Sequence, residues 1–180
     1  VRTTFCLRPS RWKAGTTHFL RGKLLLCGES KVSAARLRKP RFLTEQVIPT
    51  LKQQFRLPEN VKIILGGYSL AGLFALWAST QTNLFYGVAA ASPSVWFPGW
   101  MEFEQQRPIQ TQHIYLSLGD KEERTKNIVM AAVGDNIRAL HSQLTVRGAD
   151  CTLEWNSGGH FKNAALRTAK AFRWTMEEHT

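Results

Sequence analysis

The stretch that decides the fold is Val61-Lys62-Ile63-Ile64-Leu65-Gly66-Gly67-Tyr68-Ser69-Leu70-Ala71-Gly72. Its first five residues have the apolar character of a buried strand, and the largely apolar residues 70–79 predict a buried helix. Between them, Ser69 has small residues two positions away on each side, Gly67 and Ala71. A sharp turn from strand to helix needs small residues there, because larger side chains would collide with the strand or the helix. The pattern predicts a nucleophile elbow with the Ser69 hydroxyl exposed at its apex; the alternative is a tight turn with a structural serine.

The start of the predicted helix adds a second feature to the elbow. Backbone N–H groups in the first turn of a helix point toward whatever Ser69 attacks, and they can stabilise a negatively charged oxygen. The N–H of Leu70 is the candidate donor. Tyr68 and Leu70, the two neighbours of Ser69, are also candidate substrate-binding residues.

A serine at neutral pH is a weak nucleophile and needs a base. His160 lies in a glycine-containing turn at residues 156–161, which follows a predicted strand at 151–155. A loop at the C-terminal edge of a sheet can reach an elbow serine, so His160 is the predicted base. The other downstream histidines are expected at edge or surface positions: His113, His141 and His179.

The loop after the predicted strand 114–118 is rich in acids and reads Gly119-Asp120-Lys121-Glu122-Glu123-Arg124. Glu122 stands three positions past the glycine, which gives the chain room to leave the strand before the side chain turns back. Glu122 is therefore the first choice for the carboxylate that orients His160, Asp120 the second and Glu123 the third. The alternative is that all three belong to a solvated, charged loop.

The three candidates follow one another in the order Ser69, Glu122, His160. The α/β-hydrolase sheet places its nucleophile, acid and base in this chain order. The sequence therefore predicts the α/β class, as a three-layer sandwich of the α/β-hydrolase type around a mostly parallel sheet.

At this point several segments resemble the esterase D-like esterase family, which includes enterochelin esterases and S-formylglutathione hydrolases. The elbow at residues 67–76 looks like that of the family, and Ala91-Ser92-Pro93-Ser94-Val95-Trp96, after an expected strand at 86–90, is similar to its Ser-Pro-Ser-Leu/Val-Trp stretch. Residues 118–122 and 158–161 are similar to the segments that carry the family's acid and base. The resemblance covers about residues 42–176 and implies a serine hydrolase acting on carboxylic esters or thioesters. Family members differ widely in substrate.

Six tryptophans are spread along the chain. Trp96 lies in a loop region, where it either walls a substrate pocket or packs in the core. It is the third candidate substrate-binding residue. Plain packing is expected for Trp77, Trp155 and Trp174.

The composition agrees with one globular domain, because 180 residues suffice for a single hydrophobic core and 43% of them are hydrophobic. No apolar run approaches the roughly 20 residues that span a membrane. The three cysteines are odd in number and lack metal-site spacing, so we expect no disulfide framework, no metal, no cofactor and a cytoplasmic location. The expected partner is a small-molecule ester; the sequence does not indicate an oligomeric state.

Nearly all of the net charge of +11 lies in the first 41 residues, which contain eleven Lys and Arg against one acid, Glu29. Three interpretations are open: an arm that binds nucleic acid or an anionic surface, an organelle transit segment, or sequence foreign to the fold from a truncated or disrupted reading frame. The third is favoured, and nucleic-acid binding is not expected, because regularly spaced aromatic residues are lacking. The expected division is a basic segment at 1–41 and a hydrolase domain at 42–180.

This division bears on the sheet and on activity. Residues 1–41 can supply one or two strands at most, for example around residues 19–27, so part of the usual front of the sheet is expected to be missing or altered. No His-Gly-Gly-Gly segment for a second oxyanion donor is visible. The rival hypothesis to a working esterase is therefore a truncated, inactive hydrolase-like remnant or a binding module.

Three further helices are expected. Residues 42–55 form one, with a kink at Pro49, and residues 125–144 form another, which Gly134 can interrupt. Residues 163–177 form the closing helix. The expected inward positions of the second helix are Ile128, Ala132, Ile137, Leu140 and Leu144, and those of the closing helix are Ala165, Leu166, Ala169, Phe172 and Met176.

Overall fold

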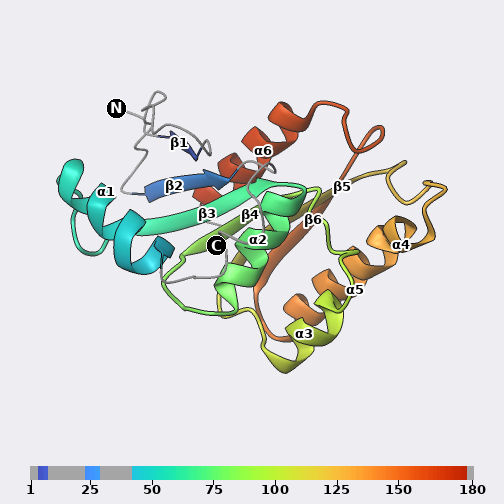
Figure 1. Ribbon diagram of the computed structural model, residues 1–180, viewed down its shortest axis with the longest axis horizontal. Coiled ribbons are helices and arrows are strands. Elements are labelled where there is room, and N and C mark those ends of the chain that lie inside the picture. Colours follow the sequence, from blue (N-terminus) through green and yellow to red (C-terminus); the bar gives the residue numbers. More distant parts are fainter. Residues whose placement is uncertain (1–3, 8–22, 29–41, 178–180) are drawn as a thin grey trace.

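The computed structural model describes residues 4–7, 23–28 and 42–177 of the chain. They form a six-stranded sheet in the order β1-β2-β3-β4-β5-β6, in which every neighbouring pair is parallel (Figure 1). The α/β class with a parallel sheet is thus confirmed. The strands are β1 (Thr4–Leu7), β2 (Lys23–Gly28), β3 (Lys62–Tyr68), β4 (Gly87–Ala91), β5 (His113–Gly119) and β6 (Asp150–Asn156).

Helices cover both faces of this sheet and make three layers. Figure 1 shows α6 on one side and α2, α3 and α5 on the other. The described helices are η1 (Phe42–Val47), α1 (Ile48–Gln54), α2 (Leu70–Ser79), α3 (Trp100–Gln106), α4 (Ile128–Ala131), α5 (Val133–Val146) and α6 (Ala164–Met176).

The core is divided between the two faces because successive side chains of a strand point in opposite directions. Ile63 and Leu65 of β3 belong to the larger core cluster, which includes residues of α2 and α5. Ile64, between them, belongs to a smaller cluster with Phe172 of α6. A parallel sheet covered on both faces explains why its strands read as continuous apolar runs.

Strand β3 continues three residues beyond the predicted apolar run, through Tyr68. The strand can pass residue 66 because it is glycine: a Cβ there would lie 2.6 Å from the Ala89 carbonyl oxygen and 2.8 Å from the Phe172 ring, too close for either neighbour. The extension carries the strand directly to Ser69, and helix α2 begins at Leu70 as expected.

The helix before β3 is confirmed, with an irregularity near the predicted kink. Residues 42–47 form a π-helical turn that passes into α1, whose second residue is Pro49. Proline lacks an N–H, and in a regular α-helix its ring collides with the carbonyl four residues earlier, here that of Glu45. Pro49 instead lies in the first turn of α1, where proline is tolerated.

The predicted helix at 125–144 is two helices, α4 and α5, separated at Ala132 rather than at Gly134. The first begins only at Ile128, where the Asn127 side chain accepts hydrogen bonds from the N–H groups of Val129 and Met130. Ile128 is 87% exposed, so its predicted inward position was wrong. The prediction holds for Ile137, Leu140 and Leu144, which are buried.

The predicted inward face of the closing helix was also wrong in part. Ala165, Leu166 and Ala169 are exposed, while Phe172 is buried as expected. The buried residues of α6 are Arg167, Ala171, Phe172 and Thr175. The face is rotated because it includes a buried arginine, Arg167, which hydrophobic periodicity assigns to solvent.

The three tryptophans expected to pack differ from one another. Trp77 and Trp174 are partly buried, and the Trp174 ring stacks on His113 with 4.6 Å between centroids. Trp155 is 39% exposed, with the Arg138 guanidinium carbon 4.8 Å from the centroid of its ring. The expectation of plain packing therefore fails for Trp155.

Both strands that precede η1 in the described part of the chain, β1 and β2, lie within the basic segment 1–41. Strand β2 pairs with β3 over six residues and ends with Gly28 opposite Gly67 of the elbow. The two strands agree with the prediction that residues 1–41 supply one or two strands at most. The division of the chain at residue 41 stays a prediction.

Candidate active site

The turn at Ser69 carries backbone strain of the kind that a nucleophile elbow requires. Ser69 has φ 59° and ψ −121°, a conformation that residues with a side chain rarely adopt. Hydrogen bonds on both sides hold it there: its N–H donates to the Ala91 carbonyl at 3.1 Å, and its carbonyl accepts from the N–H groups of Leu73 and Ser94 at 3.0 and 3.1 Å. The packing is tight, since a Cβ on Gly72 would lie 3.0 Å from the Gly67 carbonyl oxygen.

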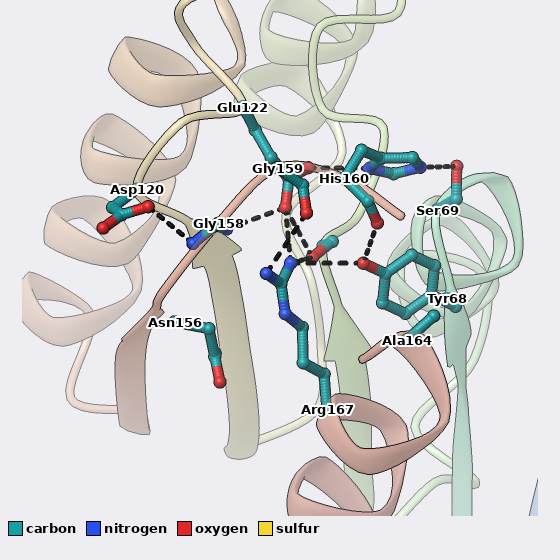
Figure 2. Close-up of polar contacts among 12 residues, drawn as sticks. Tyr68, Ser69, Asp120, Glu122, Asn156, Gly158, Gly159, His160, Ala164 and Arg167 are labelled. Carbon is teal, nitrogen blue, oxygen red and sulfur yellow. Dashed lines mark hydrogen bonds and ion pairs between the residues drawn. The ribbon is translucent and has the colours of Figure 1, made fainter. Parts of the chain in front are cut away.

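Ser69, His160 and Glu122 lie in one chain of hydrogen bonds, here called the relay (Figure 2). His160 Nε2 is 3.0 Å from Ser69 Oγ, and His160 Nδ1 is 2.7 Å from Glu122 Oε2. An ionised carboxylate can only accept, so Nδ1–H donates to Glu122, and Nε2 is left to accept the Ser69 proton. The three residues come from the turns at the C-terminal ends of β3, β5 and β6.

The Glu122 carboxylate is buried and fully engaged. Its side chain is 4% exposed, and Oε1 accepts from the Gly119 N–H at 2.7 Å, from Arg167 Nη1 at 2.8 Å and from Ser92 Oγ at 2.9 Å. Burial acts to raise the pKa of Glu122, but the hydrogen bonds from His160, Gly119 and Ser92 outweigh it and hold the pKa below 4.5. The carboxylate is therefore ionised at neutral pH.

The other two acids of the loop contact different groups. Asp120 Oδ1 accepts from the Gly158 N–H at 2.7 Å and so fastens the loop that carries His160. Glu123 forms an ion pair with Arg138 at 2.9 Å. Of the three candidate acids, Glu122, the first choice from the sequence, is the one whose carboxylate contacts the imidazole.

The loop at residues 119–124, here called the acid loop, and the loop at residues 157–160, here called the base loop, approach each other closely at Gly119. A Cβ on this residue would overlap the Gly158 carbonyl oxygen and lie 2.8 Å from Glu122 Oε1. The missing side chain is what allows the two loops to meet.

The predicted substrate-binding residues lie in different settings. The Tyr68 hydroxyl donates to the His160 carbonyl, and its ring centroid is 5.2 Å from that of His160. Leu70 is 44% exposed, and its N–H belongs to the first turn of α2, where helices leave N–H groups without helical partners. Trp96 is half-buried, packs against the larger core cluster and has its ring beside that of Phe97.

Two serines of the turn after β4 reach the site, although sequence reasoning gave neither a role. Ser94 is 1% exposed, and its Oγ lies 3.2 Å from Ser69 Oγ. Ser92, with φ 43°, donates to Glu122 as described above. The only signal for them was the Ser-Pro-Ser stretch of the family resemblance.

Arg167 is a further site residue that sequence reasoning missed. It projects from α6 and is 1% exposed, and its guanidinium contacts the elbow, the acid and the base loop (Figure 2). No motif pointed to it, since a single arginine in a helix is usually solvated.

The remaining histidines lie elsewhere. His113, at the start of β5, is buried between β4 and β6 with its Nδ1 2.6 Å from Asp150 Oδ2, so the expected edge or surface position was wrong. His141 on α5 is half-buried, with Nε2 3.3 Å from the Cys151 carbonyl. His179 lies outside the described residues.

Among the described residues, the Cys151 thiol does not compete with Ser69 as a nucleophile. Burial raises the pKa of Cys151 to about 12, so its thiol stays protonated near neutral pH. Within the residues that the structure describes, no three His, Cys, Asp or Glu side chains are grouped so as to hold a metal ion. The same residues contain no helix with the length and apolar character of a membrane span.

Comparison with known proteins gives one family and a set of solved structures. The family model described as "Putative esterase" matches residues 10–167. Among solved structures, an IroE-like serine hydrolase from Shewanella oneidensis is 19% identical with a TM-score of 0.59, over 74% of this chain and 45% of that one. The siderophore hydrolase EstA from Aspergillus nidulans is 23% identical with a TM-score of 0.56, over 76% and 55%.

A third similar structure is the enterobactin esterase FES from Shigella flexneri, which is 20% identical with a TM-score of 0.57, over 74% of this chain and 36% of that one. At these identities the solved structures support the fold alone. The chain spans about a third to a half of their lengths. Comparison with curated proteins found no match.

Proposed function

Because the chain belongs to the Putative esterase family, we propose that it is a serine hydrolase that cleaves a carboxylic ester or thioester of a small molecule through an acyl-enzyme. The observation that carries the proposal is the relay, in which Ser69 Oγ, the His160 ring and Glu122 Oε2 follow one another at 3.0 and 2.7 Å. These distances are within the range in which a base can take the proton of a serine nucleophile.

In the first half of the reaction, His160 Nε2 takes the Ser69 proton as Oγ bonds to the substrate carbonyl carbon, whose oxygen becomes negatively charged. When this tetrahedral intermediate collapses, the bond to the leaving oxygen or sulfur breaks. His160 then returns its proton to that atom, so an alcohol or thiol departs and Ser69 carries the acyl group.

In the second half, His160 takes a proton from water as the water oxygen attacks the acyl carbon. Collapse releases the carboxylic acid, and Ser69 Oγ regains the proton from His160. The ionised Glu122 accepts from Nδ1 throughout; it fixes the ring orientation and stabilises the imidazolium that forms twice per cycle.

The negative oxygen of each intermediate is assigned to the N-terminus of α2. The Leu70 N–H follows Ser69 directly and belongs to the turn whose N–H groups lack helical acceptors. A donor at this position acts on charge that develops only in the transition state, which is where a hydrogen bond accelerates the reaction most.

Exposed apolar side chains beside the reacting residues favour an apolar group in the substrate. Leu70 next to Ser69 is 44% exposed, and Phe161 next to His160 is 93% exposed. The Phe161 ring lies edge-on to the imidazole, with 5.2 Å between centroids. Such surfaces provide apolar contact for an acyl or alcohol moiety beside the relay.

The rival hypothesis of an inactive remnant or binding module predicts the same fold without turnover. The cytoplasmic location and the boundary at residue 41 stay predictions under either hypothesis. A fluorophosphonate probe separates the two hypotheses, because it forms a stable adduct only with an activated serine.

The test compares the parent chain with Ser69→Ala and with Ser142→Ala, which changes an exposed serine on α5. The parent and Ser142→Ala should be labelled, with the adduct located at Ser69 by mass spectrometry, and should hydrolyse p-nitrophenyl acetate. Ser69→Ala should lose labelling and several orders of magnitude of turnover. Folded parent protein that takes no label and cleaves no ester would favour the remnant instead.

A further inference from the structure

Arg167 is a charged side chain in the interior of the protein. In the described part of the chain it is one of the largest fully buried side chains, and it lies one turn into α6, on the face that packs against the sheet. Burying a guanidinium is costly unless it is paired and its N–H groups are satisfied. The identity of its partners therefore indicates why it is there.

The two terminal nitrogens of the guanidinium serve two different parts of the site (Figure 2). Nη1 donates to Glu122 Oε1 at 2.8 Å and to the hydroxyls of Tyr68 and Ser92, each at 3.2 Å. Nη2 donates to the Ser157 and Gly159 carbonyls at 3.3 and 3.2 Å. One planar group thus bridges the elbow, the acid and the base loop.

These contacts restrict the carboxylate. Oε1 of Glu122 is engaged by Arg167, Ser92 and the Gly119 N–H, which leaves Oε2 for His160. Rotation of the carboxylate about its terminal torsion would break all three bonds to Oε1. The three hydrogen bonds to Oε1 therefore hold the carboxylate in the orientation in which Oε2 faces the imidazole.

The contacts of Nη2 restrict the base in a similar way. The Gly159 carbonyl directly precedes His160 in the chain, and the Ser157 carbonyl lies three residues before it. The Tyr68 hydroxyl, itself an acceptor from Nη1, donates to the His160 carbonyl. The backbone on both sides of the imidazole is thus tied, directly or through Tyr68, to the same guanidinium.

We propose that Arg167 is a positioning residue for hydrolysis: its guanidinium holds Glu122 Oε1 and the base loop in one frame, so that Glu122 Oε2 meets His160 Nδ1. The proposal rests on the proposed function for its effect on catalysis. Lysine cannot replace arginine in this role, because an ammonium on a flexible stem lacks the planar fork that reaches both loops at once.

The test uses Arg167→Met, which removes the charge and the fork, and Arg167→Lys, which keeps the charge alone. Arg173→Met is the matched control, because Arg173 lies on the same helix with its side chain 80% exposed. Folding is checked by circular dichroism and thermal unfolding. Two further readouts are kcat and KM on p-nitrophenyl acetate, and the downfield proton NMR resonance of the Nδ1–H that His160 donates to Glu122.

Arg167→Met is expected to lower kcat about 100-fold with KM nearly unchanged, since a small misplacement of reacting groups has an effect of this size. Its downfield resonance should be lost or broadened. Arg167→Lys should lose roughly tenfold in kcat. Arg173→Met should match the parent in both readouts.

A folded Arg167→Met variant with parental kcat and an unchanged resonance would overturn the proposal. So would a fall in kcat with the resonance intact, because the effect would then arise away from the pair of Glu122 and His160. If the methionine variant does not fold, Arg167→Lys decides, and parental turnover with a parental resonance refutes the positioning role.

The resonance separates this inference from the proposed function. A parent chain that cleaves no ester removes the proposed function, but its Nδ1–H resonance still reports whether Arg167 aligns Glu122 with His160. Loss of that resonance in Arg167→Met would then support positioning without catalysis. An unchanged resonance would refute positioning whether or not the chain is active.

Discussion

The buried Ser94 hydroxyl oxygen lies 3.2 Å from Ser69 Oγ, and the Ser94 N–H donates to the Ser69 carbonyl at 3.1 Å. In the proposed mechanism the Ser69 proton points to His160, so Ser69 Oγ accepts the proton of Ser94. Ser94 therefore contacts the nucleophile through both its backbone and its side chain.

Ser94→Ala should lower kcat about 2- to 10-fold with little change in KM, because one neutral hydrogen bond to the nucleophile is lost. Steady-state kinetics on p-nitrophenyl acetate measure it. Ser79→Ala is the control, since this buried hydroxyl on α2 donates to the Leu76 carbonyl at 2.7 Å, away from the relay. Equal kinetic effects of the two substitutions would contradict a specific contribution of Ser94.

Neutralising the three acids of the loop one at a time should give three different results. Glu122→Gln should reduce kcat about 10³-fold or more, because the amide cannot stabilise the imidazolium. Asp120→Asn should cost roughly tenfold, through a weaker hold on the Gly158 N–H. Glu123→Gln should leave kcat unchanged, because its ion pair with Arg138 is outside the relay. A larger loss for Asp120→Asn than for Glu122→Gln would reverse the assignment of the acid.

Tyr68→Phe tests whether Tyr68 positions His160 through its hydroxyl or binds the substrate. Its hydroxyl donates to the His160 carbonyl and accepts from Arg167, so its loss should lower kcat about tenfold and leave KM nearly constant. Tyr115→Phe removes a buried hydroxyl that donates to Glu154 at 2.6 Å and should affect stability only. A change in KM with kcat preserved would indicate that Tyr68 binds substrate instead.

The contribution of Glu122 to stability should depend on pH. Its pKa in the folded protein is below the ordinary 4.5, so the ionised form stabilises the fold at pH values above 4.5, and this stabilisation is lost as the pH falls through the folded-state pKa. Glu122→Gln should lower the free energy of unfolding near pH 7 by about 1–3 kcal/mol, and less at about pH 3. Urea unfolding at the two pH values measures the difference. Glu102→Gln on α3, an exposed position, is the control; a pH-independent loss at Glu122 would refute the linkage.

Phe161→Ser tests the apolar surface beside His160. The ring is 93% exposed, so stability should not change, while KM for p-nitrophenyl butyrate should rise about 3- to 10-fold and that for the acetate less. Val146→Ser, 85% exposed at the end of α5, controls for the loss of a surface apolar group. Equal KM values for the butyrate in parent and Phe161→Ser would exclude substrate contact with this ring.

The sequence predicts most of the fold because its strands are buried on both faces and therefore read as continuous apolar runs. It also predicts which loops meet, since parallel strands bring their C-terminal ends to one edge of a sheet. For this reason Ser69, His160 and the loop with the three candidate acids could be placed near one another, while the choice among Asp120, Glu122 and Glu123 stayed open. The strained φ of 59° at Ser69 follows from the same turn.

The features that the sequence did not predict depend on contacts between distant segments, which the hydrophobic periodicity of one segment does not report. Arg167 is buried because Glu122, 45 residues earlier in the chain, supplies its counter-charge, and a helical pattern reads only the residues of its own segment. The face of α6 was misassigned for that reason. Ile128 was misassigned because α4 is a four-residue helix in which none of the residues is buried.

The absence of a side chain at Gly119 limits how this site could be redesigned. A Cβ there would meet the Gly158 carbonyl and Glu122 together, so even alanine would force the acid loop and the base loop apart. The interior side of the relay is consequently closed to sequence variation at this position. Engineering of a new substrate range has its freedom on the solvent side, at residues such as Leu70 and Phe161, which are 44% and 93% exposed.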